Sequence, residues 1–201
     1  MPDANEIIRI FISSTGFIAL FAFFEVLSRK KKLNPEEMRR VAHITGTFFG
    51  LYVTVYFSKI SFIVIASAFS LLMAISHRKH IFNHIHGVSR KTYGEELLPL
   101  GLIASYLIAG ARHGIFIPAF LITGISDPIN GFVIHKTKNM LLGFVCFWTS
   151  ATIILFFSTL LTLFTACCVA FLVGIVERVS SYGTDNFFIP ISVALLLSNI
   201  I

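Results

Sequence analysis

The chain has 201 residues, of which 56% are hydrophobic and 13% are charged, with a net charge of +6 and a mean hydropathy of +0.84. A soluble domain is less apolar and carries about twice this share of charged residues, so the composition excludes a soluble protein. It predicts an all-α, polytopic integral membrane protein. Since one crossing takes about 20 residues, the length allows about seven or eight transmembrane helices in a single domain over residues 1–201.

The apolar runs mark the expected spans in chain order. No basic segment precedes the first run and no small-residue cleavage site follows it, which predicts an uncleaved span rather than a signal peptide. The run 140–176 is too long for one crossing, so we expect a split near Ser158. The eight expected spans are 6–28, 41–57, 60–76, 97–110, 114–135, the two halves of 140–176, and 186–201.

The fifth expected span contains a break signal. Residues 124–131 read Gly-Ile-Ser-Asp-Pro-Ile-Asn-Gly, which places a glycine pair, a proline and Asp127 inside an apolar segment. Irregular backbone at membrane depth must be buried in protein or line a cavity. We therefore expect a helix broken near Asp127.

Eight crossings put alternate connectors on the same side of the bilayer. All of the sixteen basic residues except Arg9, Lys59 and Arg112 then lie on one side. By the positive-inside rule this side is cytoplasmic. The net positive charge is explained by membrane orientation, so no nucleic-acid partner is predicted.

Four connectors on this side carry residues suited to phosphoryl transfer. Carboxylates and an amide can bind Mg²⁺, while Arg and Lys offset phosphate charge. Taken singly, the arginines can be topology determinants and the glutamates can complement a helix dipole. The candidate residues are Arg39, Arg40 and His43 in the first connector, Arg90, Lys91, Thr92 and Glu95 in the second, Asp127 and Lys136 in the third, and Glu177, Asp185 and Asn186 in the fourth.

Other site types are not favoured. The stretch from Gly131 to Thr137 has His135 where a P-loop needs its second glycine, and no protein-kinase motif set is present. The cluster His77, His80, His84 and His86 could bind a metal, but di-iron membrane oxygenases need further histidine boxes, so we interpret it as an interfacial segment. The three cysteines lie in apolar runs as small hydrophobic residues.

These motifs together carry a family resemblance over residues 36–190. The pattern consists of Arg39-Arg40-x-x-His43-x-x-Gly46, Arg90-Lys91-Thr92-Tyr93-Gly94-Glu95-x-x-x-Pro99, Asp127, and Glu177 followed by Gly183-x-Asp185-Asn186-x-x-x-Pro190. It resembles the dolichol kinase and phytol kinase family of polytopic membrane enzymes. These enzymes transfer a phosphoryl group from CTP or another nucleotide to a lipid alcohol, and the group includes CTP-dependent diacylglycerol kinases.

The resemblance implies a transmembrane kinase-like domain whose partners are CTP or another nucleotide, a membrane lipid alcohol and the bilayer. It implies catalytic roles for Asp127, Glu177, Asp185 and Asn186, with Mg²⁺ bound by the three carboxylates. It implies a phosphate site shaped by Arg90, Lys91, Thr92 and Glu95, with Arg39, Arg40 and His43 near its entrance. The family's Lys-Ser/Thr-x-Glu-Gly element is not matched at 136–143, which contains no glutamate.

Two alternatives remain at this stage. The related phosphatidate cytidylyltransferases use the same nucleotide and metal but attack the α-phosphate. A transporter for an anionic solute also uses broken helices near the midplane. The acceptor lipid, the nucleotide, the catalytic base and the oligomeric state are left open by the sequence.

Overall fold

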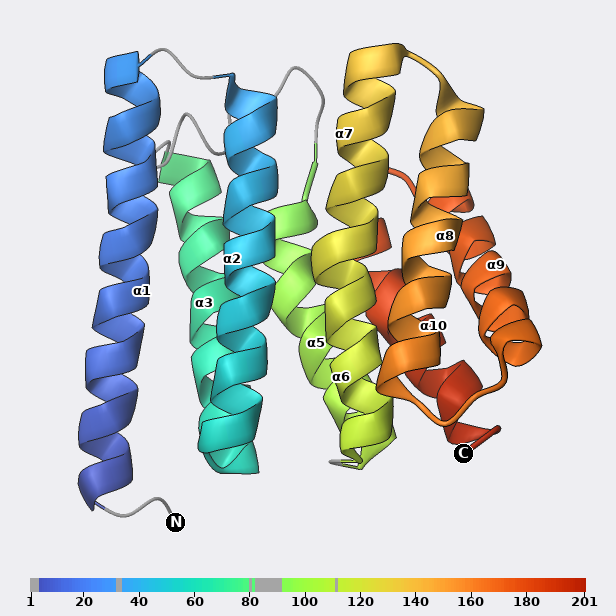
Figure 1. Cartoon of the computed structure of the whole chain (residues 1–201). Coiled ribbons are helices and arrows are strands. Elements are labelled where there is room, and N and C mark those ends of the chain that lie inside the picture. The colour runs from blue at the N-terminus through green and yellow to red at the C-terminus, as the bar shows by residue number, and fades with distance from the viewer. Residues whose placement is uncertain (1–3, 32–33, 80, 82–91, 111) are drawn as a thin grey trace.

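The computed structural model describes residues 4–31, 34–79, 81, 92–110 and 112–201. These residues form helices and no strand. The helices follow one another up and down a single bundle, with α1 at one edge and α8 and α9 at the other (Figure 1). In chain order they are α1 (Ala4–Lys31), α2 (Pro35–Tyr56), α3 (Lys59–Lys79), α5 (Gly94–Ala109), α6 (His113–Leu121), the π-helix η1 (Ile122–Ser126), α7 (Asp127–Thr137), α8 (Met140–Ser158), α9 (Leu163–Val179) and α10 (Asp185–Ser198).

Among the described helices, four are long and apolar enough to cross a bilayer. They cover Asn5–Lys31, Lys59–Lys79, His113–Thr137 and Met140–Ser158, and α10 is a shorter apolar helix. The bundle is therefore that of a helical membrane protein. The split near Ser158 is confirmed by the helix bounds.

The expected break near Asp127 is wrong. α6, η1 and α7 form one continuous helical segment of 25 residues, and the irregularity is a π-helical turn just before Asp127. In that turn the Asp127 N–H donates to the carbonyl of Ile122, five residues earlier. The wider turn accommodates Pro128, which has no N–H and would otherwise clash with the preceding turn.

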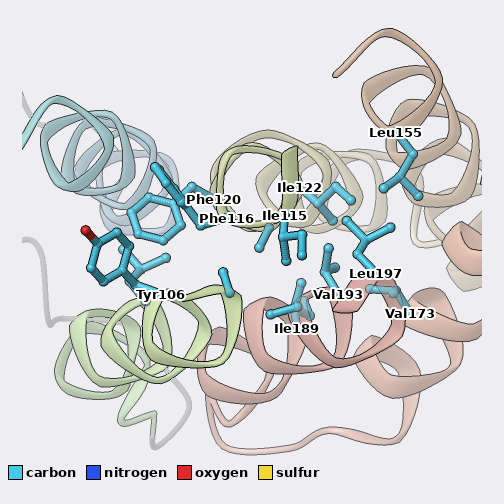
Figure 2. Packing of buried hydrophobic residues seen from close by; sticks show 14 of the residues in the cluster. Tyr106, Ile115, Phe116, Phe120, Ile122, Leu155, Val173, Ile189, Val193 and Leu197 are labelled. Atoms are coloured by element: carbon cyan, nitrogen blue, oxygen red, sulfur yellow. The ribbon is translucent and has the colours of Figure 1, made fainter. Parts of the chain in front are cut away.

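The bundle interior is packed around α10. Ile189, Val193 and Leu197 are buried at a spacing of four residues, and Figure 2 shows them facing Ile115 of α6 and Ile122 of η1. At the other end of the same core, the ring of Tyr106 lies edge-on to those of Phe62 and Phe116. Since lipid supplies little hydrophobic driving force, close van der Waals packing of this kind holds membrane helices together.

Glycines bring several helices into backbone contact. A Cβ atom on Gly101 of α5 would lie 2.6 Å from the carbonyl oxygen of Asn186, so α5 and α10 touch at this point. A Cβ on Gly124 of η1 would lie 2.6 Å from the Thr47 methyl group, which brings η1 equally close to α2. These contacts fix the start of α10 and the Asp127 turn relative to α5 and α2.

The glycine contact between η1 and α2 yields the first prediction. Gly124→Ala should lower the free energy of unfolding by about 1–3 kcal/mol, the usual cost of overpacking a tight interior. The measurement is the thermal unfolding midpoint in detergent. Gly16→Ala is the matched control because no heavy atom lies within 4 Å of its Cβ position, and equal midpoints for the two variants would contradict the close contact.

Candidate functional site

A polar cavity of about 310 Å³ lies where α2 and α10 begin and α7 and α9 end. It collects ionisable side chains from all four helices. Its polar lining residues are Glu36, Arg39, Arg40, His43, Asp127, Asn130, His135, Lys138, Glu177 and Asp185. Six of the twelve residues predicted for the site from the sequence therefore face one cavity.

The α2 wall follows from the way this helix begins. Asn34 caps the helix by accepting a hydrogen bond from the Glu36 N–H at 3.0 Å, and Pro35 occupies the first turn. The cavity residues of α2 then follow at i, i+3, i+4 and i+7, which is one helix face. Arg39, Arg40 and His43 therefore face the cavity together.

The two arginines share one carboxylate partner at long range. Glu36 Oε2 lies 3.8 Å from Arg39 Nη2 and 3.5 Å from Arg40 Nη2, beyond the usual hydrogen-bond range of about 2.7–3.2 Å. The Arg39 Nε atom is buried and has no hydrogen-bond partner among the described residues. Glu36 therefore lies near both guanidinium groups without a short contact to either Nη2 atom.

His43 is held by the π-helical turn. Because Asp127 donates to Ile122 and Pro128 has no N–H, the Thr123 carbonyl lacks helical donors at i+4 and i+5. His43 Nε2 lies 2.8 Å from this oxygen and therefore donates to it. The same nitrogen lies 3.8 Å from Asp127 Oδ2, so the contact also places the imidazole beside the carboxylate.

The α7 wall is a regular helix face. Asp127, Asn130, Ile134 and Lys138 line the cavity at i, i+3, i+7 and i+11. Lys136, which was predicted for the site, is nine residues after Asp127 and so about 180° away around the helix.

The placement of Lys136 in the site is therefore corrected. Its side chain is exposed, and its ammonium group lies 4.3 Å from the centre of the Phe132 ring. The prediction failed because it assumed a break in the helix near Asp127. With a break, helical spacing from Asp127 could not be used to decide which later side chains face the cavity. Lys138, at the left-handed C-cap of α7, supplies the cation instead.

Glu177 is oriented by an amide that the sequence analysis did not single out. Asn130 Nδ2 donates to Glu177 Oε1 at 2.6 Å, across from α7 to the end of α9. Asn130 itself is buried, and its Oδ1 occupies the place where a Cβ on Gly143 of α8 would stand. The glycine therefore lets α8 approach α7 and hold the amide in the orientation that serves Glu177.

The second and fourth connectors meet behind the cavity. The Tyr93 N–H donates to the Tyr182 carbonyl at 2.9 Å, and Gly183, with a φ of 85°, lies close to both Thr92 and Gly94. Thr92 is buried, and its hydroxyl accepts from the Gly94 N–H. These two connectors are thus in contact, although Thr92 does not line the cavity.

The polar cavity contains Asp185, whereas Asn186 and Glu95 lie deeper in the bundle. Asp185 Oδ1 accepts the Asn186 N–H at 3.0 Å, in the first turn of α10, and Asp185 faces the cavity. Asn186 is buried against Gly94, and its Oδ1 has no hydrogen-bond partner within the described part of the chain. Together with Arg39, His43 and Glu95 it lines a small space of about 20 Å³ just inside.

The predicted set and the observed polar lining of the cavity differ in both directions. Glu36, Asn130, His135 and Lys138 were not predicted for the site, although helical spacing from Arg40 and Asp127 would have identified most of them. The predicted residues Arg90 and Lys91 are outside the described residues, as are His80, His84 and His86 of the histidine cluster.

The carboxylates suit Mg²⁺ in a particular way. Among the described residues, no group of three or more His, Cys, Asp and Glu side chains is arranged to hold a metal ion by itself. Mg²⁺ usually takes one or two protein carboxylates and completes its coordination with water and substrate phosphates. Asp127, Glu177 and Asp185, all with oxygen donors on one cavity, fit this shared mode of binding.

Comparisons of the chain with protein-family models, with curated proteins and with solved structures found no match.

The amide that orients Glu177 yields a second prediction. Asn130→Asp would place two carboxylates at hydrogen-bond distance, and their repulsion when both are ionised should lower the thermal unfolding midpoint at pH 8 more than at pH 5. Asn139→Asp adds the same charge at the exposed N-cap of α8, where Asp caps as well as Asn, and should be neutral. A pH-independent effect of Asn130→Asp would contradict the contact.

The burial of Glu95 yields a third prediction. Burial raises the pKa of this carboxyl above its ordinary value of 4.5, while the nearby Arg39 opposes the rise. The folded state then binds the Glu95 proton more tightly than the unfolded state does. Proton binding therefore stabilises the folded state; this contribution is complete below pH 4.5 and is lost as pH rises through the folded-state pKa. The glutamine in Glu95→Gln does not titrate. The thermal unfolding midpoint of this variant should therefore rise relative to that of the parent protein as pH increases from 4.5 to 8. Parallel stability curves would contradict the burial of an ionisable group.

Proposed function

We propose that the protein is a membrane lipid kinase that transfers the γ-phosphoryl group of CTP, or of another nucleoside triphosphate, to a lipid alcohol. Acceptors of this class include polyprenols such as dolichol, phytol and diacylglycerol. One observation carries the proposal: a single cavity at one end of a membrane helix bundle combines arginines and a lysine with several carboxylates.

The charge balance of the cavity supports a metal-bound nucleotide. Three basic side chains, those of Arg39, Arg40 and Lys138, line the cavity together with the carboxyl groups of Glu36, Asp127, Glu177 and Asp185. The basic side chains can bind phosphate oxygens, and the carboxylates can bind a divalent cation that those phosphates share. An Mg²⁺–nucleotide complex offers phosphate oxygens to the basic side chains and a cation to the carboxylates.

The residues divide naturally between binding and transfer. In the proposed reaction the lipid hydroxyl oxygen bonds to the γ-phosphorus, the bond to the β-phosphate oxygen breaks, and CDP leaves with that electron pair. The hydroxyl proton passes to a cavity carboxylate. Arg39 and Arg40 would offset charge on the transferred group. Asp127, Glu177 and Asp185 would hold Mg²⁺, which would supply further positive charge to the phosphate groups.

The proposal includes the membrane arrangement. The helices alternate in direction along the bundle (Figure 1), which supports the expected seven or eight spans, with α6, η1 and α7 acting as one. The cavity lies at the end of the bundle that holds Arg29, Lys30 and Lys31 at the close of α1. By the positive-inside rule this end, and so the active site, would face the cytoplasm and its nucleotides.

The deciding assay offers [γ-³²P]CTP or [γ-³²P]ATP and Mg²⁺ to detergent-purified protein with polyprenol, phytol or diacylglycerol. Label should enter the organic phase with one acceptor, and CDP or ADP should form in equal amount. Release of diphosphate would favour a cytidylyltransferase and overturn the kinase. So would the absence of label from protein whose cooperative thermal unfolding shows that it is folded.

The two lysines of the α7 end form a matched pair for a fourth prediction. Lys138→Gln removes a cavity cation and should raise the KM for the nucleotide about tenfold, the effect of losing roughly 1.4 kcal/mol of binding. Lys136→Gln makes the same chemical change on the opposite helix face and should leave the KM unchanged. Equal effects of the two substitutions would show that the nucleotide does not bind in this cavity.

A further inference from the structure

A second, apolar groove of about 550 Å³ runs between α2 and the η1–α7 segment. Its α2 wall includes Val41, Ile44 and Phe48, and its facing wall includes Ile129 and Phe132. Four of these five side chains, all except Ile44, are more than a third exposed. The η1–α7 wall belongs to a helix that is long and apolar enough to cross a bilayer, which places the groove against lipid.

The length of the groove follows from the helix geometry. On α2 it extends from Glu37 to Phe48, which at about 1.5 Å per residue is about 16 Å. This is roughly half of the hydrocarbon core of about 30 Å, or the depth of one leaflet. The volume is also within the range of about 300–1,000 Å³ that is usual for small-molecule sites.

The groove is held between fixed contacts. At one end the Gly124 backbone packs against Thr47, and at the other the Arg40 guanidinium lies against Gly131. The hydrogen bond from His43 to the Thr123 carbonyl ties the two helices together along their buried side. Contacts between α2 and the η1–α7 segment therefore close the groove at both ends and along its buried side.

The groove and the polar cavity are adjacent. Arg40 and Pro128 line both of them, and the groove's only charged lining residues within the described chain, Glu37 and Arg40, lie at the same end of α2. The walls beyond this end are apolar. This arrangement complements a molecule with a long hydrocarbon chain and a small polar group at one end.

We infer that the groove binds the hydrocarbon chain of the lipid acceptor, with its hydroxyl group at the Arg40 end, next to the polar cavity. The inference rests on the proposed function and specifies how that function would obtain its second substrate. The acceptor enters from the bilayer between α2 and α7, while the nucleotide reaches the cavity from water.

Bulky substitutions in the groove test this placement. Ile44→Trp and Ile129→Trp fill it from opposite walls, and each should lower kcat/KM for the long-chain acceptor at least tenfold while changing the nucleotide KM less than twofold. Val55→Trp lies on the same helix outside the groove and should have no effect. Wild-type kinetics with the long-chain acceptor in both groove variants would overturn the groove and leave the kinase intact.

A photolabelling experiment gives an answer that does not depend on activity. Protein in phosphatidylcholine nanodiscs is exposed to a long-chain alcohol that carries a diazirine near the middle of its chain, and the labelled peptides are mapped. Labelling of residues 41–48 and 125–133 should be saturable, should be displaced by unlabelled alcohol and should fall several-fold in Ile44→Trp.

The two experiments separate the two proposals. Saturable groove labelling in a protein that transfers no phosphate would overturn the kinase and keep the lipid site. Labelling spread evenly over the exposed helices, α1 included, would overturn the lipid site whatever the kinase assay shows.

Discussion

The arrangement of the site depends on one backbone carbonyl. Pro128 removes the donor that a π-helical turn would offer to Thr123, and the His43 side chain supplies it from α2. This contact, with the Gly124–Thr47 packing beside it, sets the register of α2 against the longest described apolar segment after α1. As a result the arginine-bearing turn of α2 stands opposite Asp127 and Asn130.

Glycine contacts then bring in the remaining helices. Gly143 lets α8 press on Asn130, which orients Glu177, and Gly101 lets α10 start against α5 with Asp185 toward the cavity. Buried polar atoms left without a protein partner among the described residues gather here, namely Arg39 Nε, Glu95 Oε1, Ser126 Oγ, His135 Nδ1 and Asn186 Oδ1. Such atoms cost about 1–3 kcal/mol each when nothing satisfies them, so water or a bound ligand that reached them would stabilise this part of the bundle.

The polar cavity and the apolar groove give the proposed chemistry its physical basis. A phosphoryl transfer to a lipid must join one reactant that is insoluble in water with another that is insoluble in the bilayer. Two lining residues, Arg40 and Pro128, separate the spaces in which we place these reactants. Holding both within reach of one set of charges removes the entropic cost of their meeting.

The sequence by itself determined the features that depend on local composition. Apolar run lengths predicted the helices and the split near Ser158, and charged connectors identified three of the segments that line the cavity. The sequence pattern around Pro128 could not show that the helix would continue through a π-helical turn. The hydrogen bond that satisfies the Thr123 carbonyl in this turn comes from His43, 80 residues away in the chain. For that reason Lys136 was chosen and Asn130 and Lys138 were missed. Whether a side chain faces the cavity is decided by helix register, and register is set by glycine contacts and hydrogen bonds between helices that only the tertiary structure reveals.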